Sequence, residues 1–154
     1  MQLTMYTDYS LRVLMYLGRH QSEQTTIEDI VDYYSVSRNH LTKVVHNLAV
    51  CGFVRTTRGR KGGIALLRKP SDINVRDVVL NTEKNFNIVE CLQSTTSSCT
   101  VEDNCHLRHV FQLATDQFLN VLGDYTLADL IKDGSVLDFK TMIYDKWARI
   151  PESV

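Results

Sequence analysis

The sequence predicts a mainly α-helical fold that contains one small β-hairpin. Three short helical patterns of apolar residues come before residue 51, a glycine-rich basic turn follows between two β-rich runs, and a long apolar stripe of helical period begins near residue 105. The chain has 154 residues, 44% of them apolar and only two of them proline, which fits one folded domain with an extension.

The first 50 residues are expected to form three helices. Thr7 and Asp8 lie at the start of the first pattern, where their oxygens can cap free backbone N–H groups. Thr26 and Asp29 have the spacing of a capping box at the start of the second. Gly52 follows the third helix, where a left-handed conformation closes many helices. The predicted ranges are 7–18, 26–34 and 38–50.

The middle of the chain changes its period. Two β-rich runs flank the turn 58–63, so a β-hairpin is predicted over residues 53–68. A long helix is expected to begin at Cys105 and to carry an apolar stripe over residues 107–125. The remaining expectations are a short helix at 74–83, an irregular polar loop at 84–104, a short helix that Thr126 and Asp129 cap, and a weakly patterned tail at 135–154.

Charge is divided unevenly along the chain. Residues 1–69 contain ten Lys or Arg and five Asp or Glu, whereas residues 70–154 contain seven and thirteen, so net charges of +5 and −6 add up to the overall −1. This division favours a polyanion-binding part joined to a part with another task. A chance excess of surface lysine and arginine in the first half is the alternative.

Helix, helix, short turn, helix and basic hairpin is the order of a winged helix-turn-helix, which places the third helix in the major groove of DNA. Arg38 can bind guanine O6 and N7 there, and Asn39 can bind adenine N6 and N7. The side chains expected to reach bases or phosphates from this helix are Ser37, Arg38, Asn39, His40 and Lys43. Double-stranded DNA is therefore the predicted partner.

The tip of the predicted hairpin adds Arg58, Arg60 and Lys61, which alternate with glycines. Arginine from such a tip can enter a narrow minor groove. The same glycine-rich turn lacks the Gly-Lys-Ser/Thr ending of a phosphate-binding P-loop, and the five histidines show no catalytic spacing. We therefore do not expect an enzyme.

Three of the four cysteines, Cys91, Cys99 and Cys105, fall within fifteen residues. Thiolates are ligands for zinc and for iron–sulfur clusters, and the wide gaps between them favour a cluster. The candidates for a fourth ligand are Asp8, His106 and His109. Three unrelated thiols are the alternative. Cys51, which stands apart beside Gly52, is expected to be structural.

Together these residues resemble the NsrR/IscR/RirA group of iron–sulfur winged-helix regulators, over almost the whole chain to about residue 133. The segments that carry the resemblance are Met1-Gln2-Leu3-Thr4, Tyr6-Thr7-Asp8-Tyr9, Val36-Ser37-Arg38-Asn39-His40, Arg58-Gly59-x-x-Gly62-Gly63, the three cysteines, and Asn120-x-x-x-Asp124-Tyr125-Thr126-Leu127-Ala128-Asp129-Leu130.

The resemblance implies a homodimeric repressor that binds a [4Fe–4S] cluster, with [2Fe–2S] as the alternative. The ligands would be the three cysteines and Asp8 of the partner subunit, as in the nitric-oxide-sensing members, and nitric oxide would release the DNA. His106 or His109 would replace Asp8 if the chain follows other members, although neither has their spacing. An iron- or cluster-responsive regulator is the runner-up, and a zinc-stabilised interaction module is a distant alternative.

The predicted organisation has three parts. Residues 1–70 form the winged helix-turn-helix, residues 71–104 the connecting helix and cluster-binding loop, and residues 105–154 the dimerisation helix and C-terminal extension. The sequence lacks an apolar run of the roughly 18 residues that a membrane helix needs, and its start lacks the basic-then-apolar pattern of a signal peptide. We therefore expect a soluble cytoplasmic protein without a membrane partner.

Overall fold

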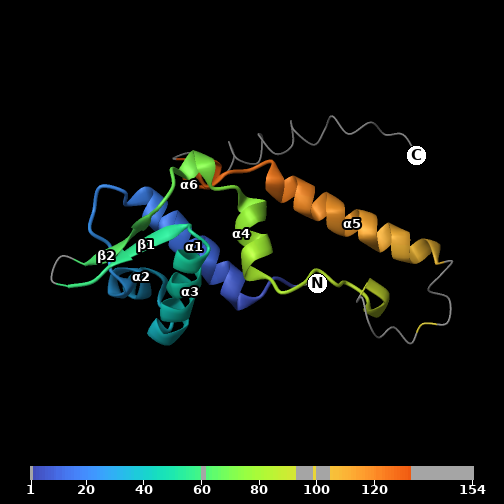
Figure 1. Cartoon of the computed structure of the whole chain (residues 1–154), viewed down its shortest axis with the longest axis horizontal. Coiled ribbons are helices and arrows are strands. Elements are labelled where there is room, and N and C mark those ends of the chain that lie inside the picture. The colour runs from blue at the N-terminus through green and yellow to red at the C-terminus, as the bar shows by residue number, and fades with distance from the viewer. Residues whose placement is uncertain (1, 60–61, 93–98, 100–104, 133–154) are drawn as a thin grey trace.

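The computed structural model describes residues 2–59, 62–92, 99 and 105–132. The fold is mainly α-helical with one two-stranded antiparallel hairpin, as predicted (Figure 1). Its elements are α1 (Met5–Arg19), α2 (Ile27–Tyr34), α3 (Arg38–Val50), β1 (Val54–Thr57), β2 (Gly63–Leu66), η1 (Pro70–Asp72), α4 (Val75–Thr82), η2 (Glu90–Leu92), α5 (His106–Gly123) and α6 (Leu127–Ile131). The first three helices and the hairpin cluster at one end, and α5 extends away from them (Figure 1).

The hydrophobic core lies between α1, α2, α3 and the hairpin. Each of the residues predicted to face inward from α3 is at most 3% exposed; they are Leu41, Val44, Val45 and Leu48. Burial of such a side chain stabilises the fold by about 1.5–3 kcal/mol. Ile73 and Leu127 belong to the same core, and the backbone N–H of Leu127 donates to the carbonyl of Ile73 at 2.8 Å. The segment that follows α5, with α6, therefore returns to the core of the first three helices and the hairpin.

The start of α1 differs from the prediction. The helix begins at Met5, and Thr4, not Thr7 or Asp8, is its N-cap, because the extended backbone of Thr4 lets its hydroxyl accept from the N–H of Thr7 at 3.3 Å. Thr7 is buried and its hydroxyl instead donates to Thr82 of α4 at 2.9 Å. The Thr7 side chain, which was predicted to cap α1, therefore makes a contact between α1 and α4 that local sequence patterns do not predict.

The end of α1 also lies one residue later than predicted. Gly18 remains helical, and the helix continues to Arg19. A Cβ at position 18 would lie 2.9 Å from Cδ1 of Ile131 in α6. The glycine therefore favours the close approach of Ile131 of α6 to α1.

Other terminal signals are confirmed. The N–H of Thr26 donates to Asp29 at 2.7 Å, and the N–H of Asp29 donates to the Thr26 hydroxyl at 3.3 Å, which completes the predicted capping box. Gly52 adopts a positive φ of 72° just after α3. Cys51, the C-cap of α3, is half-buried against the core, in agreement with a structural role.

The hairpin forms the wing. Its register pairs Val54 with Leu66 and Thr57 with Gly63. The wing is fixed to the helices because the N–H of Ile64 donates to the carbonyl of Thr25 at 2.7 Å. A Cβ on Gly62 would collide with the carbonyl oxygen of Thr57, so the turn of the wing requires glycine at this position.

The long helix α5 buries little of its surface within one chain. Thr115 is its only buried residue, whereas Leu107, Val110 and Leu113 are 58–60% exposed. Since each residue advances about 100° around a helix, these three side chains share one face, which differs from that of Thr115. The helix predicted for dimerisation therefore presents an uncovered apolar face. Across the described residues, no helix has the length and apolar character needed to cross a membrane.

Candidate functional site

The N-terminal end of α3 presents the side chains that were predicted to contact DNA. Ser37 is the N-cap in an extended conformation, and its hydroxyl makes no capping bond. All of the α3 candidates and the first wing candidate are exposed; they are Ser37, Arg38, Asn39, His40, Lys43 and Arg58. Arg60 and Lys61 lie outside the described residues. Exposed polar and basic groups at the start of this helix have the arrangement that major-groove recognition needs.

Arg38 has a partner that sequence patterns did not identify. Its Nε donates to Oε1 of Glu28, in the first turn of α2, at 2.6 Å. The side chains of Arg38 and Glu28 are 66% and 58% exposed, so the pair lies on the surface. The hydrogen bond from Arg38 is the main cause of a lowered pKa of Glu28. A spacing of ten residues across a turn has no periodic signal, which is why only the tertiary structure reveals this pair.

Two contacts connect α3 to α1. The hydroxyl of Tyr6 donates to the backbone carbonyl of Lys43 at 3.3 Å. The ring of Tyr9 stacks with that of His40 at a centroid distance of 6.3 Å. The candidate recognition helix is thus connected to the helix that carries Asp8.

Asp8, the predicted ligand from a partner subunit, lies in the first turn of α1. Its Oδ2 pairs with Nε of Arg12 at 3.0 Å, and the side chain of Asp8 remains 48% exposed. The Arg12 guanidinium also lies over the ring of Tyr34, 5.7 Å from its centroid. Asp8 is therefore accessible from outside its own subunit and oriented by an arginine on the next turn.

None of the four cysteines forms a disulfide bond. Cys91 lies in η2, Cys99 is exposed, and Cys105 is the N-cap of α5 without a side-chain capping bond. Figure 1 shows η2 and the beginning of α5 at the end of the molecule farthest from the wing. His106 and His109, the alternative ligands, are exposed in the first turn of α5.

The three cysteines and Asp8 do not form a ready-made metal site. Within residues 2–59, 62–92, 99 and 105–132, the structure contains no group of three or more His, Cys, Asp or Glu side chains that could hold a metal ion. Residues 93–98 and 100–104, which connect the three cysteines, lie outside the described residues. Cysteine thiols and an accessible carboxylate are nevertheless donor types that metal ions and iron–sulfur clusters accept.

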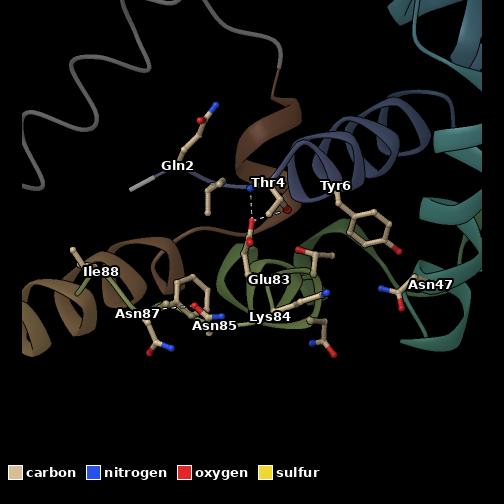
Figure 2. Close-up of a pocket in the computed structure, with 13 residues that line it drawn as sticks. Gln2, Thr4, Tyr6, Asn47, Glu83, Lys84, Asn85, Asn87 and Ile88 are labelled. Carbon is tan, nitrogen blue, oxygen red and sulfur yellow. Dashed lines mark hydrogen bonds between the residues drawn. The ribbon is translucent and has the colours of Figure 1, made fainter. Parts of the chain in front are cut away.

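A cavity of about 830 Å³ lies between the start of α1, the end of α4 and the segment that leads to Cys91 (Figure 2). Glu83 closes one side of it, because its Oε1 accepts from the N–H of Thr4 at 2.7 Å and from the Thr4 hydroxyl at 3.0 Å. Asn47 of α3 borders the same cavity. The segment before the cysteines is therefore connected to α1 and lies near the recognition helix. Sequence patterns did not single out Glu83, because its partner is 79 residues away.

Residues 3–133 match the sequence model of the Rrf2 family, described as an iron-dependent transcriptional regulator. The chain is 48% identical over 134 residues to the HTH-type transcriptional regulator NsrR of Bacillus subtilis, a match that covers 86% of this chain and 92% of that protein. It is 47% identical over 132 residues to NsrR of Bacillus licheniformis, covering 85% and 92%. These relatives are named as transcriptional regulators, in agreement with the prediction that the chain is not an enzyme.

Solved structures agree on the fold. IscR of T. potens matches with a TM-score of 0.69 at 23% identity, covering 89% of this chain and 90% of that one. CymR, the global cysteine regulator of B. subtilis, matches with a TM-score of 0.70 at 23% identity, covering 88% and 99%. From the family match, the identity to regulators named NsrR and the winged-helix fold, we conclude that this chain is a DNA-binding transcriptional regulator of the Rrf2 family.

Proposed function

We propose that this regulator is a repressor that senses nitric oxide through a bound iron–sulfur cluster. The observation that carries the proposal is that three of its four cysteines fall between residues 91 and 105 and form no disulfide bond, in a chain 42–48% identical to several regulators named NsrR. We assign Cys91, Cys99 and Cys105 as ligands of one subunit and Asp8 of the partner subunit as the fourth, with a [4Fe–4S] cluster as the expected cofactor. The cluster would supply iron, to which nitric oxide binds.

The position of Cys105 supports its part in this ligand set. It is the N-cap of α5, next to the N–H groups of the first helical turn, and its sulfur makes no capping bond. Cys91 lies in η2, which packs against α5. Two of the three thiols thus belong to neighbouring elements at one end of the molecule (Figure 1).

The position of Asp8 supports a contribution from a second subunit. Asp8 belongs to α1, which packs against α3, whereas Cys91 belongs to η2, which packs against α5. Its carboxylate is accessible, and Arg12 orients it. A homodimer through the exposed apolar face of α5 would provide the second subunit, because Leu107, Val110 and Leu113 are exposed in the described part of the chain.

The response then follows from the contacts of α1. Release of Asp8 from its ligand position would free the first turn of this helix, and the same helix contacts α3 through Tyr6 and Tyr9. A shift of α1 would therefore change the position of the recognition helix, and two recognition helices with altered spacing would lose the paired half-sites of an operator. In this organisation residues 1–70 form the DNA-binding part, residues 71–104 the connecting helix and cluster-binding loop, and residues 105–154 the dimerisation helix and C-terminal extension.

The test is anaerobic purification of the full chain, iron and sulfide analysis, an absorbance spectrum, and titration of the DNA complex with nitric oxide. We expect a coloured protein whose DNA affinity falls on nitric oxide addition. A colourless protein with unchanged affinity would refute the proposal, and bound zinc would favour an interaction module.

Asp8→Ala tests the fourth ligand. It should retain iron on the three cysteines but lose much of the response to nitric oxide, because the oxygen ligand at α1 is gone. The matched control is Asp32→Ala, an exposed aspartate on α2. An unchanged response in Asp8→Ala would shift the assignment to His106 or His109, and paired alanine variants of these two would then decide.

The description of the family as iron-dependent favours a second candidate, an iron- or cluster-status-responsive regulator. Iron chelation distinguishes the two signals. DNA release on iron chelation, from a complex that does not respond to nitric oxide, would support iron status as the signal.

A further inference from the structure

We propose that Glu28 is a positioning residue that makes Arg38 selective for guanine in the operator. The proposal rests on the DNA contact assigned to Arg38 and adds to it a residue of α2 that determines specificity. Its basis is the juxtaposition of Glu28, in the first turn of α2, and Arg38, the first residue of α3.

The pair with Glu28 leaves the two terminal nitrogens of the Arg38 guanidinium available. Glu28 accepts from Nε of Arg38 at 2.6 Å, and Nε is on the side of the planar guanidinium. The two terminal nitrogens of arginine are the donors that bind guanine O6 and N7 as a fork. Nε of Arg38 is bound to Glu28, and 66% of the Arg38 side chain is exposed. The two terminal nitrogens therefore remain available to bind a base.

The backbone that carries Glu28 lies in a capped helical turn. It belongs to a helix turn that the capping box of Thr26 and Asp29 fixes, and an acidic side chain in a first turn is favoured by the helix dipole. The hydrogen bond from Arg38 lowers the pKa of Glu28, which favours the ionised carboxylate that accepts it. An arginine side chain that is ordered before DNA binding loses less conformational entropy when it binds a base than an arginine side chain that is not ordered.

The alternative is a role of charge alone. A carboxylate close to DNA phosphates weakens binding to every sequence equally, so its removal would strengthen binding without a change in base preference. Asp32 provides the matched control: it lies on the same helix, is exposed, and its change to asparagine removes the same charge. Positioning and charge therefore predict different results for Glu28→Gln and Asp32→Asn.

The experiment uses the full chain, purified anaerobically with its metal retained. A randomised duplex library first gives the preferred site of the wild type. Fluorescence anisotropy then measures the affinity for duplexes in which each guanine of that site is replaced in turn, with wild type, Arg38→Ala, Glu28→Gln and Asp32→Asn. Thermal melting checks that each variant is folded.

We expect one guanine position at which the wild type discriminates by about five- to hundredfold and Arg38→Ala does not. At that position alone, Glu28→Gln should lower the discrimination about threefold or more, and Asp32→Asn should leave it unchanged. In the Arg38→Ala background, Glu28→Gln should have no further effect on discrimination, which a general structural role would not predict.

Three results would overturn the inference while the DNA-binding function stands. The first is unchanged discrimination in Glu28→Gln. The second is improved discrimination together with tighter binding in Glu28→Gln, which would mean that Glu28 competes with the base for Arg38. The third is a guanine preference that survives Arg38→Ala. A wild type that selects no sequence would instead refute the DNA-binding function itself, and the inference with it.

Discussion

Thr4 and Glu83 join the start of α1 to the end of α4 through two hydrogen bonds to one carboxylate oxygen, at 2.7 Å from the Thr4 N–H and 3.0 Å from its hydroxyl. Thr4 is also the N-cap of α1, and Glu83 is the C-cap of α4. One pair thus fixes the helix that carries Asp8 against the segment that leads to Cys91 (Figure 2).

Glu83→Ala is expected to lower the free energy of unfolding by about 1 kcal/mol, because two hydrogen bonds to a charged, partly exposed acceptor are lost. For a chain of this size that corresponds to a Tm lower by about 2–4 °C. Thermal unfolding monitored by circular dichroism measures the change. Asp77→Ala, at an exposed acid of α4, should have a smaller effect; equal decreases in the two variants would contradict the role of the Thr4–Glu83 pair.

The capping box of α6 predicts a dependence of stability on pH. Hydrogen bonds from Lys132 and from Thr126 lower the pKa of Asp129 from 3.8 to about 2. Because this pKa is lower in the folded chain than in the unfolded one, the contribution of Asp129 is complete above about pH 4 and is lost as the pH falls towards 2. Asp129→Asn should therefore reduce stability at pH 6 by roughly 1–2 kcal/mol and have a smaller effect near pH 2.

Urea unfolding of wild type and Asp129→Asn at several pH values between 6 and 2 measures this difference. Asp77→Asn removes a comparable acid from α4 and should follow the wild-type profile. If the difference between wild type and Asp129→Asn is the same at every pH, the pKa of Asp129 is not lowered in the folded chain.

Gly62→Ala should open the wing while leaving the helices folded. The new Cβ would collide with the Thr57 carbonyl and would lie 2.8 Å from that of Gly59, so the turn has to rearrange at a cost of about 1–3 kcal/mol. Hydrogen exchange should show faster exchange of the Ile64 amide, which donates to Thr25, with α1 unaffected. Thr56→Ala, at an exposed strand position, serves as the control. Unchanged protection of Ile64 would show that the turn tolerates a side chain.

Val110→Lys should convert the proposed dimer into monomers. Val110 is 59% exposed in one chain, at the centre of the apolar face of α5, and a buried unpaired lysine in a subunit interface is strongly unfavourable. Sedimentation analysis at several concentrations gives the molecular mass. Gln112→Lys adds the same charge to another face of α5 and should preserve the dimer; monomerisation by both variants, or by neither, would argue against this face as the interface.

Local signals in the sequence were sufficient for most elements. The capping boxes of α2 and α6 join residues three apart, and the buried positions of α3 recur with helical period, so both are visible in one short window. The predicted start of α1 was wrong because it depended on a contact between residues far apart in the sequence. Thr7 has the chemistry of a cap, but its hydroxyl contacts Thr82, 75 residues away, while Thr4 provides the cap.

The candidate site divides in the same way. The exposed polar start of α3 followed from the order of helices and from residue type, because a recognition helix needs donors at its first turn. The partner of Arg38 did not follow, since Glu28 lies on another helix and no period relates the two positions. The ligand role of Asp8 stays a prediction: the residues connecting Cys91, Cys99 and Cys105 lie outside the described part of the chain.

By itself, the sequence determined the helical class, the winged helix-turn-helix order, the basic first half and the cluster of cysteines, because each depends on residue type and spacing over a few turns. Only the tertiary structure decided that Glu28 pairs with Arg38, that Glu83 joins α1 to α4, and that an apolar face of α5 is exposed in the described part of the chain. The physical reason is that burial and hydrogen-bond partners across long separations depend on how helices pack, which local periodicity does not encode.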